Sequence, residues 1–180
     1  MSRKKEVVIP KKIVVLIILI IVIGLIVVCN ITLKNNKNKA DNNTVSELDI
    51  SKYKDYEVPV AYYYYGIQNK NFDVFLKAYP EFMNIKDQFT ADDLDNFYTT
   101  YKDECGDNIK ISYEIGEEVH YTQEQLTELV NYISANYNQE INITDAYVIN
   151  ITEKYTGDKQ TVESKKTQIV FQFNGQWFSL

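Results

Sequence analysis

Val170-Phe-Gln-Phe-Asn-Gly-Gln-Trp-Phe178, near the end of the 180-residue chain, is its clearest structural signal. Asn174-Gly175 separates two aromatic-rich runs, and this dipeptide favours a type I′ turn, whose two central residues need positive φ. The stretch therefore predicts a β-hairpin that closes a sheet.

Further strands are expected upstream of this hairpin, because apolar and polar residues alternate with a period of two, as in half-buried strands. A turn at Thr156-Gly157-Asp158-Lys159 joins the last two of them. With the hairpin, the pattern predicts about four strands, of which the last three form a meander. The alternating apolar residues are Ile109, Ile111, Tyr113 and Ile115, then Tyr147, Ile149 and Ile151, then Val162, Ile169, Phe171 and Phe173.

Helices are expected before and between these strands. Their predicted starts are Tyr56, with Pro59 in the first turn, then the caps Asn71, Thr90 and Thr122. The first should end near Gly66, the second at Pro80 and the last near Tyr137. Helices on one face of a curved antiparallel sheet of about four strands form an α+β domain, which we expect over residues 53–180.

The helix pair, the link Gly66-Ile-Gln-Asn-Lys-Asn-Phe72 and the closing hairpin resemble the nuclear transport factor two-like superfamily. They are most similar to its membrane-anchored or lipoprotein forms in Gram-positive bacteria. The resemblance implies a cone-shaped α+β fold in which helices cover a concave sheet, with a cavity that binds small ligands in some members. The helix expected at 122–137 departs from simple members and leaves the strand topology open.

Residues 13–33 form one apolar segment between Lys12 and Lys34. As a helix it would be about 31 Å long, which matches a hydrocarbon core of about 30 Å. The sequence therefore predicts a transmembrane helix through which the protein binds the membrane. Two alternatives are a cleaved secretory signal and a lipoprotein modified at Cys29, although Val28 is larger than the small residue that normally precedes a lipidated cysteine.

The basic residues around this segment predict its orientation. The tail 1–12 carries five basic residues, whereas Lys34, Lys37 and Lys39 follow the segment. The positive-inside rule places the N-terminus in the cytoplasm and the C-terminal domain outside the cell, beyond a flexible linker at 34–52. The abundance of Asn, Ile, Lys and Tyr indicates an AT-rich bacterial genome.

The charge of the C-terminal domain excludes one class of partner. Residues 45–180 hold 11 lysines and 23 acidic residues, which is a net charge of −12. Such a surface repels phosphate backbones, so we expect no nucleic-acid binding.

Few side chains in the domain indicate catalysis or a metal site. His120 is the only histidine and is expected at the surface, while Cys105 is expected to be a buried thiol or else a dimerisation site. Zinc needs three or four ligands, so we expect no metal and no cofactor. Glu114, Glu117 and Glu118 are interpreted as solvated residues beside a turn.

Tyr62-Tyr-Tyr-Tyr65 is the most unusual local feature. Consecutive residues surround a helix, so at most two of these rings can face the core. One hypothesis is a ligand-binding pocket lined by Tyr63, Tyr64 and Trp177. The alternative is that the tyrosines are half-buried core residues whose hydroxyls reach water.

Three functions are compatible with this sequence. The first is a non-enzymatic domain, anchored in the cell membrane, that binds a protein partner or a small ligand at the cell surface. The second is an assembly subunit of a cell-envelope machine, such as a type IV secretion or conjugation system. The expected partner of the domain is another protein or a second copy of this chain. The third is an isomerase-like or dehydratase-like enzyme, because the resembled fold hosts such activities and fold alone does not choose among functions.

Overall fold

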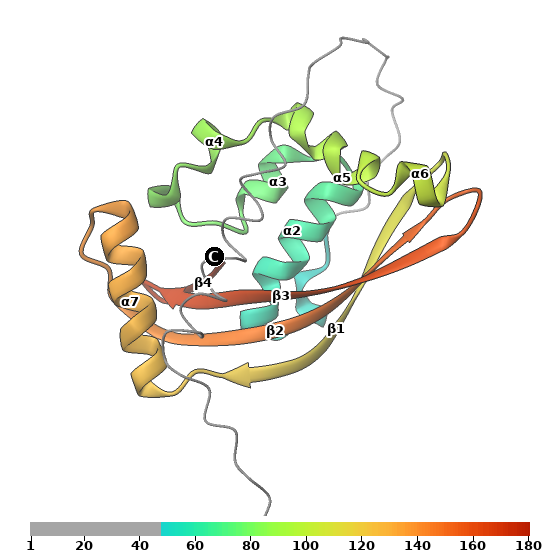
Figure 1. The fold of residues 1–180 in the computed structure, drawn as a ribbon. Helices are drawn as coiled ribbons and strands as arrows, with labels where there is room; N and C mark the ends of the chain where they lie inside the picture. Colours follow the sequence, from blue (N-terminus) through green and yellow to red (C-terminus); the bar gives the residue numbers. More distant parts are fainter. Residues whose placement is uncertain (1–47) are drawn as a thin grey trace, which may run out of the picture. The chain divides into compact units, whose positions relative to one another are not determined.

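The computed structural model describes residues 48–180 (Figure 1). The predicted tail at 1–12, the transmembrane segment at 13–33 and most of the linker at 34–52 lie outside the described residues. Within residues 48–180, no helix has the length and apolarity needed to cross a membrane.

Four strands form one antiparallel sheet in the order β1-β2-β3-β4, so each strand pairs with its neighbour in sequence. This confirms the predicted meander and the α+β class, and it settles the strand order that the sequence left open. The long strands curve beneath the helices in Figure 1. The strands are β1 (Lys110–His120), β2 (Ile143–Thr156), β3 (Thr161–Phe173) and β4 (Gln176–Ser179).

The closing hairpin has the expected turn. Asn174 and Gly175 both have positive φ, 52° and 77°, as a type I′ turn requires. Phe173 pairs with Gln176, and Phe171 pairs with Phe178. The register places Trp177 opposite Gln172 and so decides which face of the sheet carries the indole.

Short helices precede β1, and one long helix lies between β1 and β2. Asn71 accepts a hydrogen bond from the Val74 amide at 3.1 Å, and Thr122 forms the predicted capping box with Gln125. The helices are η2 (Ile50–Lys52), η3 (Asp55–Glu57), α2 (Val58–Gln68), α3 (Phe72–Leu76), η4 (Glu81–Met83), α4 (Ile85–Gln88), η5 (Ala91–Asp95), α5 (Asn96–Thr99), α6 (Lys102–Cys105) and α7 (Gln123–Tyr137).

The single helix predicted after Thr90 is wrong, because the chain forms three short pieces there: η5, α5 and α6. The hydroxyls of Thr99 and Thr100 both donate to the Asn96 carbonyl, at 3.0 and 2.9 Å. Such side-chain to backbone hydrogen bonds compete with the regular backbone hydrogen bonds of a helix, and they account for the interruption between α5 and α6. The sequence also gave no sign of η4 and α4, which are too short for a period to be visible.

The two faces of the sheet carry different layers. Ile149, Ile151 and Val170 pack with Tyr64 of α2, whereas their neighbours Ala146 and Phe171 point to the opposite face. α7 packs on that opposite face through Leu129 and Ile133. The prediction that all helices share one face is therefore wrong for α7, because alternate residues of β2 and β3 are apolar on both sides.

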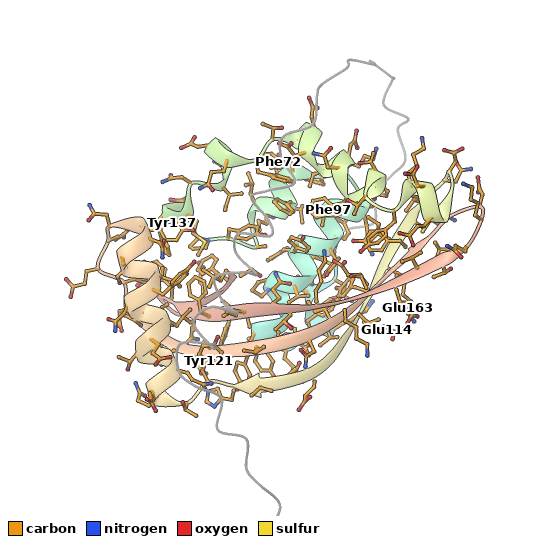
Figure 2. All side chains as sticks on the ribbon, in the orientation of Figure 1. Phe72, Phe97, Glu114, Tyr121, Tyr137 and Glu163 are labelled. Carbon is orange, nitrogen blue, oxygen red and sulfur yellow. The ribbon has the colours of Figure 1, made fainter. Side chains whose placement is uncertain are left out.

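Beyond α7, the opposite face is polar. Glu114 and Glu163 lie there, away from Phe72 and Phe97 on the α2 side (Figure 2). Lys154 lies between the two acids, with Nζ–O distances of 2.6 and 3.6 Å. In this part of the sheet, the buried side chains therefore lie on the α2 face.

Candidate functional site

An open groove runs between β4, the start of α2 and the segment from α3 to α4. It has a volume of about 980 Å³. Its apolar lining comes from elements far apart in the sequence, which the curvature of the sheet brings together. The eight apolar or aromatic residues are Val58, Tyr62, Leu76, Tyr79, Pro80, Ile85, Trp177 and Phe178.

Trp177 is held in this groove by the closing hairpin and by two tyrosines. Its indole contacts the rings of Tyr56 and Tyr147, each at a centroid distance of 5.8 Å. Those two tyrosines stack on each other at 4.1 Å. The indole is half-buried, so one side is fixed by neighbours and the other lines the groove.

The structure does not bring the three predicted ligand residues together in this groove. Trp177 lines it beside Tyr62, while Tyr64 is only 2% exposed and stacks on Tyr113 at 4.2 Å. Tyr63 packs on the other side of α2, against Phe75 at 5.3 Å. The run of four tyrosines therefore does contribute one residue to the groove, but that residue is Tyr62. Tyr63 and Tyr64 point elsewhere, because successive residues point in different directions around a helix.

Glu153 is a buried acid that no sequence motif identifies as a site residue. Its side chain is 1% exposed and accepts hydrogen bonds from the hydroxyls of Tyr64, at 2.7 Å, and Tyr155, at 2.8 Å. The Lys166 ammonium lies 2.9 Å away. Burial, and then the Glu153 charge, raise the pKa of both tyrosines, which therefore remain neutral donors. Glu153 continues the alternation of Tyr147, Ile149 and Ile151, which accounts for its inward side chain, but this spacing does not distinguish an ionised residue from an apolar one.

These contacts stabilise the packing of α2 on the sheet. Replacing Tyr64 with phenylalanine removes one donor from a buried carboxylate, so we expect a loss of about 2 kcal/mol in unfolding free energy. Tyr62→Phe is the matched control, with an expected change of less than about 0.5 kcal/mol. Trp177 is the only tryptophan, so its fluorescence during urea unfolding reports on the domain alone. Equal stabilities of the two variants would contradict this role for Glu153.

Glu118 lies within β1, at a register shift between Ile115 and Glu118, so its interpretation as a solvated turn residue is wrong. Its side chain is 14% exposed and accepts a hydrogen bond from Tyr56 at 2.9 Å. The Lys54 ammonium lies 2.5 Å from the same oxygen, Oε2. Burial alone would raise the pKa of Glu118, but the hydrogen bonds that it accepts from Lys54 and Tyr56 outweigh burial, and the pKa is lowered. These contacts fix the segment that carries Tyr56 beneath Trp177.

His120 and Cys105 have the environments expected of structural residues. His120 ends β1, is exposed, and lies 2.5 Å from Asp145 through Nε2. Cys105 is fully buried, and its Sγ lies 3.2 Å from the Tyr155 carbonyl oxygen, which rules out its alternative as an exposed dimerisation site. Among residues 48–180, no group of three or more His, Cys, Asp or Glu residues is placed to hold a metal ion.

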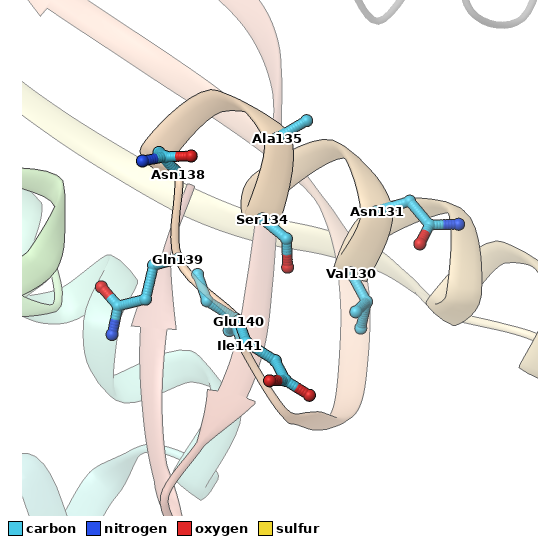
Figure 3. Close-up of a pocket in the computed structure, with 8 residues that line it drawn as sticks. All are labelled: Val130, Asn131, Ser134, Ala135, Asn138, Gln139, Glu140 and Ile141. Carbon is cyan, nitrogen blue, oxygen red and sulfur yellow. The ribbon is translucent and has the colours of Figure 1, made fainter.

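A second hollow lies beside the C-terminal end of α7, between that helix and the loop that follows it (Figure 3). Val130 and Ile141 are its larger apolar residues, and the other side chains are small or polar. No aromatic residue lines this hollow, whereas four aromatic residues, Tyr62, Tyr79, Trp177 and Phe178, line the groove at β4. The β4 groove, which we call the Trp177 groove, is therefore the better candidate for binding.

No known family model, curated protein or solved structure matches this chain. The resemblance to the nuclear transport factor two-like superfamily therefore stays a prediction. Function has to be inferred from the Trp177 groove itself.

Proposed function

We propose that this protein is a non-enzymatic binding protein anchored in a cell membrane, which engages a protein partner through the Trp177 groove. In this proposal residues 13–33 cross the bilayer, the N-terminus is cytoplasmic, and the domain binds its partner outside the cell. The length and apolarity of residues 13–33 and the basic tail support the location.

The groove is the observation that carries the binding role. Trp and Tyr are enriched among the residues that dominate binding energy at protein interfaces. Trp177 and Tyr62 line one open hollow, and the contacts of Trp177 with Tyr56 and Tyr147 hold its ring in place before any partner arrives. Such preorganisation lowers the entropic cost of binding.

Affinity purification after chemical cross-linking of membranes tests this function. The full chain should recover a partner, and Tyr62→Ala should reduce its yield about tenfold or more, because truncation of an interface hot spot costs roughly 2 kcal/mol. Tyr132→Ala removes a half-buried tyrosine from α7, outside the groove, and should leave the yield unchanged. A chain that is always recovered alone, or equal yields from both variants, would count against the proposal.

A further inference from the structure

The Trp177 groove has an acidic rim that its own domain does not neutralise. Four carboxylates line it, and each is exposed; within the described part of the chain none of them forms an ion pair or a side-chain hydrogen bond. Acids elsewhere often pair with lysine, as Asp95 does with Lys70 at 2.7 Å. The four unpaired acids are Asp55, Asp73, Glu81 and Asp87.

Two lysines also line the groove but do not balance these acids. Lys77 lies over the ring of Tyr62, with its ammonium 5.7 Å from the ring centroid, and Lys86 makes no ion pair with a described residue. The lining therefore has a formal net charge of −2, within a domain that is acidic as a whole. A cationic partner would gain attraction both from the rim and from the wider field.

The floor of the groove is aromatic and has one unused hydrogen-bond donor. Among the described residues, none accepts a hydrogen bond from the indole Nε1 of Trp177. Val58 and Leu76 extend the apolar surface of the groove. This surface suits a large apolar side chain, and the exposed face of an indole also attracts a nearby cation.

We propose that the Trp177 groove binds a basic segment of the partner protein, and this inference rests on the function proposed above. Lysine or arginine side chains of that segment pair with Asp55, Asp73, Glu81 and Asp87. An aromatic or long aliphatic side chain between them packs on Trp177. The groove is open and, at about 980 Å³, has room for several residues of a peptide.

The test uses the full chain in nanodiscs of neutral phospholipid, with Trp177 fluorescence as the signal. The first probe is a short amidated peptide that alternates lysine with phenylalanine and leucine. A second peptide replaces every lysine with glutamate, and a third replaces the apolar residues with serine. Empty nanodiscs measure any binding of the peptides to lipid.

The basic apolar peptide should change the fluorescence saturably, and the other two should bind at least about tenfold more weakly, since each loses either the charge or the apolar contact. Replacing the four rim acids with Asn or Gln should lower the affinity of the basic apolar peptide by about tenfold or more. Neutralising four exposed acids outside the groove should change its affinity less than about twofold. These control acids are Asp92, Asp103, Glu117 and Glu128.

Equal binding of the acidic peptide, or an affinity that does not change when the rim is neutralised, would overturn the inference. So would calorimetric binding of the basic peptide without any change at Trp177. If a partner is captured at the groove from membranes but no basic peptide binds, the binding function stands and the basic segment is wrong. If neither is observed, both proposals fail.

Discussion

The domain should unfold steeply as the pH rises above about 10, because several of its tyrosines are buried as neutral phenols. Desolvation by burial is the main cause that raises the pKa of these hydroxyls in the folded state. In the unfolded chain the same groups ionise near pH 10. The tyrosines with the largest upward shifts are Tyr63, Tyr64, Tyr79, Tyr113 and Tyr155.

The sign of this pH dependence follows from the number of protons that each state binds. Below pH 10 both the folded and the unfolded state keep the tyrosine protons, so these groups do not change the stability. Above pH 10 the unfolded state loses the protons first, so the stability falls as the pH rises. Each tyrosine that stays protonated contributes about 1.4 kcal/mol per pH unit, or roughly 7 kcal/mol per unit for five. A domain with an unfolding free energy of about 5–15 kcal/mol would therefore unfold within about two pH units.

Tyrosinate absorbance and Trp177 fluorescence, followed together in one alkaline titration, check this expectation. The buried tyrosines should ionise only as the fluorescence changes. Tyr79→Phe is a clean variant, because no hydrogen bond to its hydroxyl is present in the described structure, and it should reduce the slope by about 1.4 kcal/mol per pH unit. Complete tyrosine ionisation before any loss of structure would contradict the burial described here.

Gly66→Ala should destabilise the domain by about 3 kcal/mol or more, because it forces α2 away from α3. A Cβ on Gly66 would lie 2.6 Å from the backbone N and Cα of Phe75, and these atoms cannot move without the helix. Helix propensity alone would give the opposite sign, because alanine in place of glycine inside a helix stabilises it by up to about 1 kcal/mol. A loss of stability would therefore come from the contact with Phe75.

Gly116→Ala is the matched control for this substitution. Its nearest contact would be the Asn150 carbonyl oxygen at 3.2 Å, which a small shift relieves. We expect a loss of less than about 1 kcal/mol in urea unfolding followed by Trp177 fluorescence. A Gly66→Ala protein as stable as the unchanged one would mean that α2 and α3 do not pack as closely as described.

The sequence predicted the elements whose signals are local. Asn174-Gly175 identified the hairpin, and Thr122 with Gln125 identified the start of α7, because turn and cap chemistry involves residues close together in the chain. It could not predict that α7 lies on the opposite face from α2. That arrangement depends on which side of β2 carries Ala146, and a register shift between Ile143 and Asp145 precedes it.

The candidate site was predicted only through Trp177. Its partners in the groove come from α2, α3 and α4, and no sequence spacing connects these segments with β4. Glu153 was missed for a related reason. Its position in β2 indicates an inward side chain, but the hydroxyls of Tyr64 and Tyr155 that make a buried carboxylate tolerable are visible only once α2 lies on the sheet.

Site-specific photo-cross-linking in native membranes tests the binding role of the Trp177 groove most directly. A photoreactive phenylalanine analogue is placed at Tyr62 in the groove and, as the control, at Lys165 on the polar face of the sheet. We predict an adduct with a second protein from position 62 and none from position 165. No adduct from position 62, or the same adduct from both positions, would contradict the proposal that this groove binds the partner.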